Sequence, residues 1–241
     1  MKVFNPPNSN LLHIEVINAI INAIVSGSLQ PGDRIIEQHI AAEMQISRAP
    51  VREAIRELVA QDIIQFIPRK GAYIAPLNPK KIQEIYLLRS CLEGLAARLT
   101  VALLTEKDFN ELCLLNLKMG EAILKNDAGA FIEYDLAFHE LICQRSGYAQ
   151  LIKMIDGVRI QTRLFMIMSK WNMVSHSQLN REMNAHQPIL DAFRDRNQDE
   201  VEQRMRTHII TSGNLLLEYL AEDEQKKSKQ SARKGLRDQV G

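Results

Sequence analysis

The sequence predicts a mainly α-helical protein, in which an N-terminal winged helix-turn-helix with a small β-hairpin wing precedes an all-helical bundle. Three observations predict this fold. Aromatic residues make up only 5% of the 241 residues, while leucine, isoleucine, alanine and methionine are plentiful, which favours helices over a β-sandwich. The first 76 residues follow the order helix, short strand, helix, turn, helix, hairpin. From residue 79 to about residue 221, the chain reads as successive helices.

The N-terminal part predicts three helices and a hairpin. Apolar residues at helical spacing predict a helix over residues 12–25, and a Pro-Gly turn then leads into a short extended segment at 34–36. A second, short helix is expected at 37–44, and Ser47 is a good N-cap for a third helix that runs to about residue 61. β-prone segments flank the turn Pro68-Arg69-Lys70-Gly71, which predicts a hairpin with two cations at its tip.

The remaining chain predicts a helical bundle behind a short linker at Leu77-Asn78-Pro79. Thr105, with Asp108 three residues later, resembles a helix-capping pair. Residues 1–10 are polar and expected to be mobile, and residues 223–241 are polar and mostly basic, so a disordered tail is expected there. The expected helices cover residues 79–103, 106–125, 128–146, 148–171, 177–196 and 199–221.

Net charge, cysteine content and hydropathy limit the partners and the cellular compartment that can be expected for the protein. The formal net charge is +1, so any nucleic-acid site must come from local clustering of cations. Cys91, Cys113 and Cys143 are widely spaced and form no CxxC pair, which is typical of reduced residues in a cytosolic protein. The sequence shows no secretory signal pattern and no apolar run near the roughly 20 residues that span a bilayer. A cytoplasmic protein without a membrane partner is therefore expected.

The stretch "ISRAPVREAIREL" places Arg48, Arg52 and Arg56 four residues apart on the third expected helix. In a helix-turn-helix this second helix of the pair lies in the major groove, and its first residues reach base edges. Arg48 and Arg52 are therefore predicted to read bases, while Arg56 contacts phosphate or pairs with Glu53. Ser47 and the free amides of the helix start suit a phosphate.

A solvated helix face is the alternative interpretation of these arginines, because Glu53 and Glu57 lie between them. Residues 1–76 carry equal numbers of cationic and acidic side chains, so the overall charge does not decide. Placement favours DNA, since the cations gather on the third helix and at the hairpin tip. There Arg69 and Lys70 suit the minor groove or adjacent phosphates.

Three histidines of the helical part have a patterned neighbourhood. Asp135 and His139 are four residues apart and share a helix face, while His186 and His208 lie on two further helices. An aspartate and imidazoles from three helices could hold one divalent metal inside a bundle. The alternative is that these are core or interface histidines with ordinary hydrogen-bond partners.

The motifs "SGSLQPGDRI", "SRAPVREAIREL" and "RKGAYIAP" resemble the GntR-type winged-helix regulators over about residues 11–76. The resemblance implies that Ser47, Arg48, Arg52 and Gly71 touch operator DNA. One departure is that the second helix carries Gln38 and His39 where family members often have a cation that reaches DNA. The predicted DNA-binding residues are Arg34, Ser47, Arg48, Arg52, Arg56, Arg69, Lys70 and Gly71.

Residues 80–221 resemble the FCD domain, the all-helical ligand-binding domain of the FadR branch of these regulators. Its Asp-x-x-x-His pattern followed by two further histidines matches Asp135, His139, His186 and His208. The resemblance implies a zinc or nickel ion at these residues, often with a small carboxylate ligand. The departures are Ala185, where a glutamate often precedes the third ligand, and Tyr148, where an asparagine often follows Ser-Gly.

Arginines are the candidates for contact with an organic acid. Arg89 matches an arginine that often faces the pocket of this domain, and bidentate pairing with a carboxylate is its natural chemistry. Pairing with Glu93 four residues later is the alternative. Arg163 and Arg159 share a helix face that could also line the cavity, and their alternative is ordinary salt bridges.

These observations support a metabolite-responsive transcription regulator that binds a palindromic operator as a homodimer and senses a small organic acid. Its parts would be a DNA-binding domain at 1–76, an effector-binding and dimerisation domain at 77–222, and the tail. The second hypothesis is a metal-dependent hydrolase-like enzyme whose Asp/His cluster activates water. The sequence contains no HExxH motif and no clear candidate for a separate general base, which argues against the enzyme hypothesis. The third is a helical adaptor with structural histidines.

Overall fold

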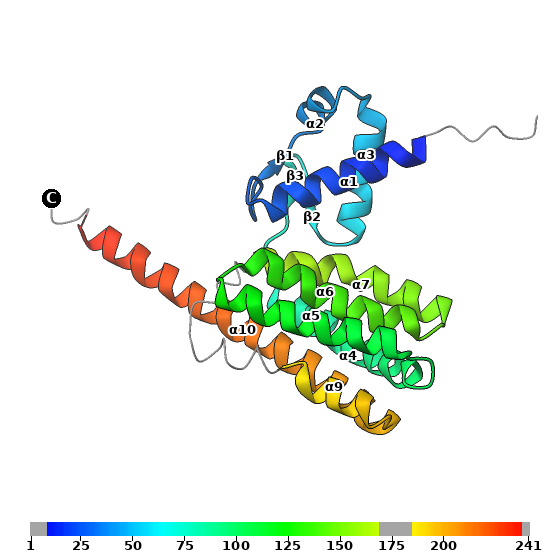
Figure 1. The fold of residues 1–241 in the computed structure, drawn as a ribbon. Helices are drawn as coiled ribbons and strands as arrows, with labels where there is room; N and C mark the ends of the chain where they lie inside the picture. Colours follow the sequence, from blue (N-terminus) through cyan, green and yellow to red (C-terminus); the bar gives the residue numbers. More distant parts are fainter. Residues whose placement is uncertain (1–8, 169–184, 238–241) are drawn as a thin grey trace, which may run out of the picture. The chain divides into compact units, whose positions relative to one another are not determined.

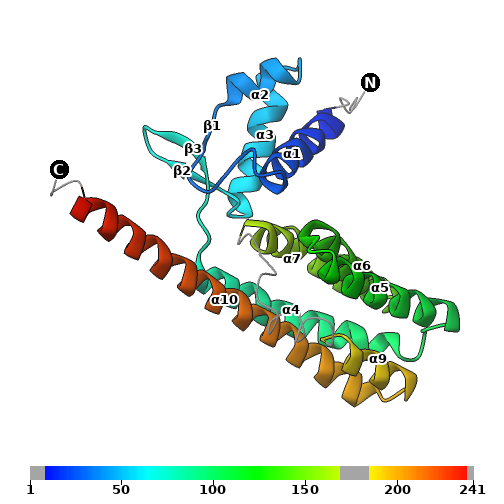
Figure 2. The ribbon, with the colours of Figure 1, turned by 60° about the vertical axis from the view of Figure 1, so that its left-hand side comes forward.

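A computed structural model describes residues 9–168 and 185–237 (Figures 1 and 2). The chain forms two compact units, residues 1–77 and 78–241. The first contains three helices and a small antiparallel sheet, and the second is helical wherever it has regular structure in the described residues. The predicted fold class, a winged helix-turn-helix followed by an all-helical domain, is confirmed. No helix in the described part of the chain combines the length and hydrophobicity that crossing a bilayer requires.

The first unit has the element order that the sequence predicts. Strand order in the sheet is β1-β3-β2, and both pairings are antiparallel. Ile67 pairs with Gly71, so a short turn at residues 68–70 joins β2 to β3 and completes the hairpin of the wing. The elements are α1 (Ser9–Val25), β1 (Arg34–Ile35), α2 (Glu37–Glu43), α3 (Arg48–Ala60), β2 (Ile64–Ile67) and β3 (Gly71–Ile74).

The apolar faces of α1 and α3 form the core of this unit. Val16, Ile20 and Ile24 of α1 are buried, as are Val51 and Leu58 of α3. Each such side chain stabilises the fold by about 1.5–3 kcal/mol when it leaves water. Because the apolar stripe of α3 faces inward, the opposite face with its arginines is exposed.

A tight turn sets the geometry of the wing. Gly71 has φ +108°, a backbone conformation that side chains with a Cβ rarely adopt, so glycine suits this position. The amide of Lys70 donates a 3.0 Å hydrogen bond to the carbonyl of Ile67. The guanidinium of Arg34 on β1 lies 3.7 Å from where a Cβ of Gly71 would stand, so Arg34 lies beside the wing.

The second unit is built on the pair formed by α4 and α10, which lie side by side (Figure 2). The predicted capping pair is confirmed, because Thr105 and Asp108 exchange side-chain to backbone hydrogen bonds in both directions at the start of α5. Asn78 caps α4 by accepting from the amides of residues 80 and 81. The helices are α4 (Pro79–Thr100), α5 (Glu106–Leu124), α6 (Ala128–Arg145), α7 (Ala149–Met168), α9 (Gln187–Arg194) and α10 (Gln198–Arg237).

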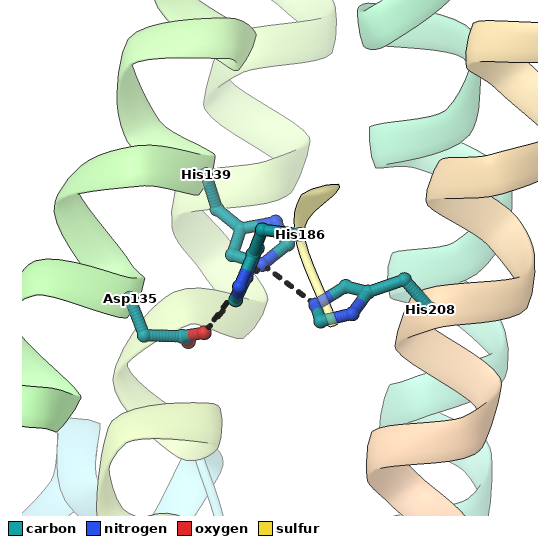
Figure 3. A group of neighbouring side chains, drawn as sticks. All are labelled: Asp135, His139, His186 and His208. Carbon is teal, nitrogen blue, oxygen red and sulfur yellow. Dashed lines mark hydrogen bonds and ion pairs between the residues drawn. The ribbon is translucent and has the colours of Figure 1, made fainter. Parts of the chain in front are cut away.

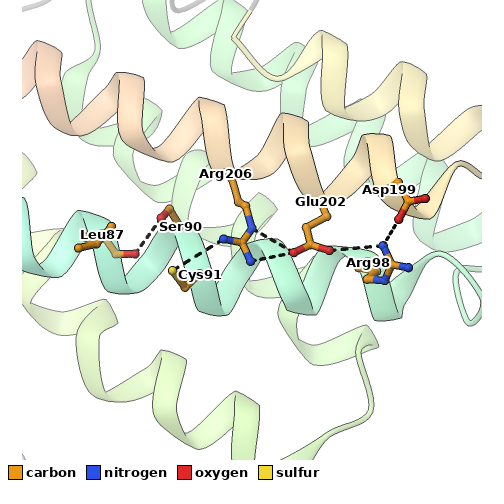
Figure 4. Close-up of polar contacts among 7 residues, drawn as sticks. All are labelled: Leu87, Ser90, Cys91, Arg98, Asp199, Glu202 and Arg206. Carbon is orange, nitrogen blue, oxygen red and sulfur yellow. Dashed lines mark hydrogen bonds and ion pairs between the residues drawn. The ribbon is translucent and has the colours of Figure 1, made fainter.

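Two glycines let α4 and α10 approach each other closely. A Cβ at Gly94 would lie 2.6 Å from Cγ of Arg206, and one at Gly213 would lie 2.7 Å from the ring of Tyr86. Ion pairs accompany this packing, since Arg98 pairs with Asp199 and Glu202, and Arg206 pairs with Glu202 and contacts the sulfur of Cys91 (Figure 4). This packing holds α10, which carries one of the candidate metal ligands, firmly against α4.

Two expected boundaries differ from the structure. The helix α10 continues to Arg237, whereas the sequence predicts a disordered tail from residue 223. Residues 223–237 contain glutamate, glutamine, lysine, alanine and arginine without proline, and a helix propagates more easily than it nucleates. The helix expected at 177–196 begins at Gln187, beside Pro188 in its first turn, while residues 177–184 lie outside the described residues. The ends expected at 238–241 and 169–171 also lie outside them.

Candidate DNA-binding face and metal centre

Apart from Gly71, which is half-buried, the candidate DNA-binding residues are exposed on the first unit. Ser47 occupies the N-cap position of α3, but its hydroxyl makes no capping hydrogen bond. Arg48, Arg52 and Arg56 are exposed along the outer face of the same helix. Arg69 and Lys70 are exposed in the wing turn. The structure therefore brings the predicted residues of α3 to one helix face, with cations also at the tip of the wing.

Glu37, which the sequence analysis did not single out, contacts both leading arginines. Its Oε2 accepts a 2.8 Å hydrogen bond from Nε of Arg52 and a 3.1 Å bond from Nη2 of Arg48. The hydrogen bond from Arg52, with a further bond from Arg48, lowers the pKa of Glu37, so the carboxylate is charged at neutral pH. The only feature of the sequence that indicates this contact is an acidic residue at the start of the second expected helix.

The four predicted metal ligands converge inside the second unit (Figure 3). Asp135 and His139 lie one turn apart on α6, His208 lies on α10, and His186 stands directly before α9. One ligand atom from each residue lies within 4.8 Å of the others. All four residues are buried, and His186 is completely inaccessible to solvent. Packing of three separate segments therefore creates a single site from residues up to 73 positions apart, from Asp135 to His208.

The nitrogen and oxygen atoms face one another at short range. Nε2 of His139 lies 3.2 Å from Nε2 of His208 and 3.9 Å from Oδ1 of Asp135. Nε2 of His186 lies 3.2 Å from the same carboxylate oxygen. Neither ring nitrogen of His186 makes a hydrogen bond of good geometry, although both are buried. A buried imidazole without such a partner is costly, which is the situation a bound metal would relieve.

Burial and charge set the protonation of the cluster. Burial lowers the pKa of His186 against the opposing effect of Asp135, and it lowers the pKa of His208 well below the usual range. Burial alone would raise the pKa of Asp135, but the close contact with His186 and the neighbouring imidazoles hold it well below its usual value. The site therefore presents a carboxylate and at least two neutral imidazoles at neutral pH, the forms that coordinate a metal.

A second group of charges, on α4, supports His139. Glu93 is buried, and its Oε2 lies 2.8 Å from Nδ1 of His139 while its Oε1 accepts a 2.6 Å hydrogen bond from Nε of Arg89. Burial would raise the pKa of Glu93, but the charge of Arg89 reverses this effect and brings the pKa to about 2. From the sequence, Glu93 is expected only as a possible partner of Arg89, because His139 lies 46 residues further along the chain and no local pattern indicates the second contact.

A small cavity adjoins His139 between α4, α6 and α7. It has a volume of about 20 Å³, which matches about one water molecule. Arg89 and Arg159 line this cavity, whereas Arg163 is not among its lining residues. Arg163 instead pairs with Glu133 at 2.7 Å. Arg159 pairs with Glu140 at 2.6 Å and with Asp156 at 3.4 Å. The geometry thus favours Arg159 over Arg163 as a cavity residue.

Comparison with known proteins agrees with both units. Residues 12–74 match the model of the family "Bacterial regulatory proteins, gntR family", and residues 84–211 match the FCD domain. An uncharacterised HTH-type transcriptional regulator of Bacillus subtilis, YdhC, is 26% identical over 200 residues, covering 81% of this chain and 87% of that protein. The gluconate operon transcriptional repressor of Bacillus subtilis is 33% identical over 146 residues, covering 61% of this chain and 60% of that protein.

Solved structures share the fold. The structure of McbR/YncC from Escherichia coli superposes with a TM-score of 0.72 at 24% identity, covering 86% of this chain and 97% of that chain. A GntR regulator from Rhodococcus sp. RHA1 gives a TM-score of 0.68 at 20% identity, with coverage of 85% and 97%. The FCD match alone covers more than half of the chain, and it lies directly behind the DNA-binding match. The chain therefore belongs to the gntR family of bacterial regulatory proteins that carry an FCD domain, and it is a transcription regulator, not an enzyme.

Proposed function

We propose that this regulator binds a palindromic operator as a homodimer and responds to a small organic acid at a divalent metal centre in its FCD domain. The observation that carries the proposal is the convergence of Asp135, His139, His186 and His208 in one buried cluster. The same chain carries an exposed row of arginines on its recognition helix. The proposed effector site and the proposed DNA-binding face therefore belong to one chain.

The DNA-binding half rests on the exposed face of α3 and on the wing. Arg48 and Arg52 lie at the start of the helix, where side chains reach base edges in the major groove. Backbone phosphates suit Arg56 and Ser47, since the hydroxyl of Ser47 makes no capping hydrogen bond within the helix. A single winged helix reads a half-site, so two copies related by a two-fold axis fit a palindrome. The remaining backbone contacts are assigned to Arg34, Arg69, Lys70 and Gly71.

The sensing half rests on the donor set and its surroundings. Three imidazoles and one carboxylate suit zinc or nickel, and a bound ion would supply positive charge and an open position for an oxygen ligand. Arg89 and Arg159 border the adjoining cavity and provide the cations that an acid requires. The cavity holds about one water molecule, so an acid that binds there must move the side chains that line it apart.

Metal analysis tests this proposal. The purified protein, stripped and then reloaded with zinc or nickel, should hold one ion per chain, and His186→Ala/His208→Ala should lose it. His39→Ala, which changes a histidine of the other unit, serves as the matched control and should keep the ion. Metal affinity should fall on acidification, because protons compete for the imidazoles. Equal metal content in the double variant and the wild type would contradict the proposed centre.

A further inference from the structure

We propose that Glu37 is a specificity-determining residue of the DNA-binding face, which positions Arg48 and Arg52 for base edges and opposes their capture by phosphates. The inference deepens the proposed function, because it rests on the base-reading role of these two arginines. Glu37 itself needs no contact with DNA for this role. It acts through the guanidinium groups that it holds.

A single carboxylate oxygen joins the two helices of the helix-turn-helix. Oε2 of Glu37 lies 2.8 Å from Nε of Arg52 and 3.1 Å from Nη2 of Arg48. Glu37 is the first residue of α2, and the arginines belong to the first two turns of α3. The position at the start of α2 also suits a carboxylate, because the positive end of the helix dipole lies there. The contact therefore fixes both side chains relative to the helix pair.

The donors that remain free differ between the two arginines. Arg52 uses Nε for Glu37, which leaves the Nη1 and Nη2 fork without a role in this contact. Two parallel donors of this kind match O6 and N7 of guanine. Arg48 uses Nη2 for Glu37, so its fork is already partly engaged. The geometry thus leaves Arg52 a complete terminal fork for bidentate reading of guanine, whereas Arg48 shares one of its terminal nitrogens with Glu37.

The charge of Glu37 acts against non-specific binding. Two guanidinium groups and one carboxylate leave one net positive charge where the arginines alone would present two. The side chains of Arg48, Arg52 and Glu37 are 54%, 53% and 30% exposed, respectively. A phosphate that approaches the two arginines therefore also meets the carboxylate. Non-specific binding depends almost entirely on phosphates, whereas a guanine edge carries no net charge. The carboxylate therefore weakens phosphate binding more than base reading, which raises specificity.

Binding measurements on two duplexes test the inference. The first duplex is the one that the wild-type protein selects from a randomised library, and the second is a scrambled duplex of the same length and composition. Affinity for each is measured across a range of salt concentrations. Glu37→Gln should bind the scrambled duplex more tightly, with a steeper salt dependence. Its preference for the selected duplex should fall by roughly tenfold, within the range of one good base contact.

The matched control is Glu43→Gln, which removes the same charge from the other end of α2. It should leave the preference for the selected duplex unchanged. Surface ion pairs contribute little to folding, so both variants should fold. Equal effects of the two substitutions would reduce the role of Glu37 to general charge and overturn the inference.

Arg52→Ala separates this inference from the proposal beneath it. If Arg52→Ala keeps the full preference, the base-reading role of Arg52 is wrong. If Arg52→Ala loses the preference while Glu37→Gln keeps it, Glu37 is not a positioning residue. Adding Glu37→Gln to the variant Arg48→Ala/Arg52→Ala should cause no further loss of preference, since the effect passes through those two arginines. Additive losses, or a switch to a different preferred base at one position in Glu37→Gln, would mean that Glu37 contacts DNA independently and would overturn the inference.

Discussion

At the scale of single residues, the second unit depends on one buried carboxylate. Glu93 stands between the guanidinium of Arg89 and Nδ1 of His139, so one side chain pairs with a buried cation and contacts a candidate metal ligand. Because Nδ1 of His139 lies 2.8 Å from the carboxylate of Glu93, its Nε2 is left to face the other residues of the cluster. The two sequence interpretations of Arg89 are thus compatible, because Arg89 pairs with Glu93 and also borders the cavity.

Glu93→Gln should therefore damage both stability and metal binding. The substitution leaves Arg89 buried without a counter-charge, which should lower the free energy of unfolding by about 3–5 kcal/mol. Loss of the contact with His139 should weaken metal affinity by about 10–100-fold. Urea unfolding and competition with a metal-binding dye measure the two effects.

Glu140→Gln is the control for this prediction. Glu140 pairs with Arg159 in a partly exposed position, where removal of an ion pair costs about 0–1 kcal/mol. Metal affinity should stay at the wild-type value in this variant. Similar destabilisation in both variants would show that burial of the Arg89 pair does not determine its contribution.

At the scale of elements, α4 has two contrasting faces. One face carries the buried pair of Arg89 and Glu93, and the other exposes an apolar stripe of Leu87, Leu88 and Leu95 with Cys91 among them. Exposed apolar stripes of this kind mark interaction surfaces. A second copy of the chain is the occupant that the proposed dimer requires, and the same stripe on both copies suits a two-fold interface.

Leu88→Glu/Leu95→Glu should convert the protein to a monomer, because it would bury two carboxylates in the interface. Binding to a full palindrome should weaken, while binding to an isolated half-site should stay near the wild-type value. Sedimentation velocity measures the first effect and DNA titration the second. Leu117→Glu/Leu124→Glu, at exposed leucines of α5, is the matched control and should remain dimeric. Dissociation of the control alone would place the interface on α5 instead.

At the scale of the whole molecule, α4 is the element that runs from the linker to the proposed effector site. It begins directly after the linker, where Asn78 caps it and Pro79 stiffens its first turn. Ten residues after its first residue, the same helix carries Arg89 at the cavity. An acid that binds to Arg89 would therefore act on the helix that follows the linker. A shift of that helix would change the orientation of the arginines on α3.

This linkage predicts reciprocal coupling. The ligand is the acid, from a panel of small carboxylates, that raises the melting temperature of the metal-loaded protein most. Its affinity, measured by calorimetry, should change by about 5–150-fold when operator DNA is bound, which corresponds to a coupling of about 1–3 kcal/mol. Operator affinity must change by the same factor when the acid is present.

Two arginines of α7 supply the control for the coupling. Arg159→Gln should abolish the response to the acid, because Arg159 borders the cavity. Arg163→Gln should keep the response, because Arg163 pairs with Glu133 outside that lining. Equal acid affinity in the presence and absence of operator would show that this site does not control DNA binding.

The sequence by itself determined the fold class, the wing and its turn, the capping pair of α5, and the identity of the four residues that converge in the bundle. The first three depend on local patterns, namely apolar periodicity and turn and capping residues, which act before any long-range packing, whereas the four residues of the cluster follow from the Asp-x-x-x-His spacing together with the resemblance to the FCD domain. Tertiary structure alone decided that Glu37 joins Arg48 to Arg52, that Glu93 reaches His139, and that Arg159 rather than Arg163 borders the cavity. Each of these contacts depends on how one helix is rotated against another, and that rotation is set by the packing of side chains from distant segments.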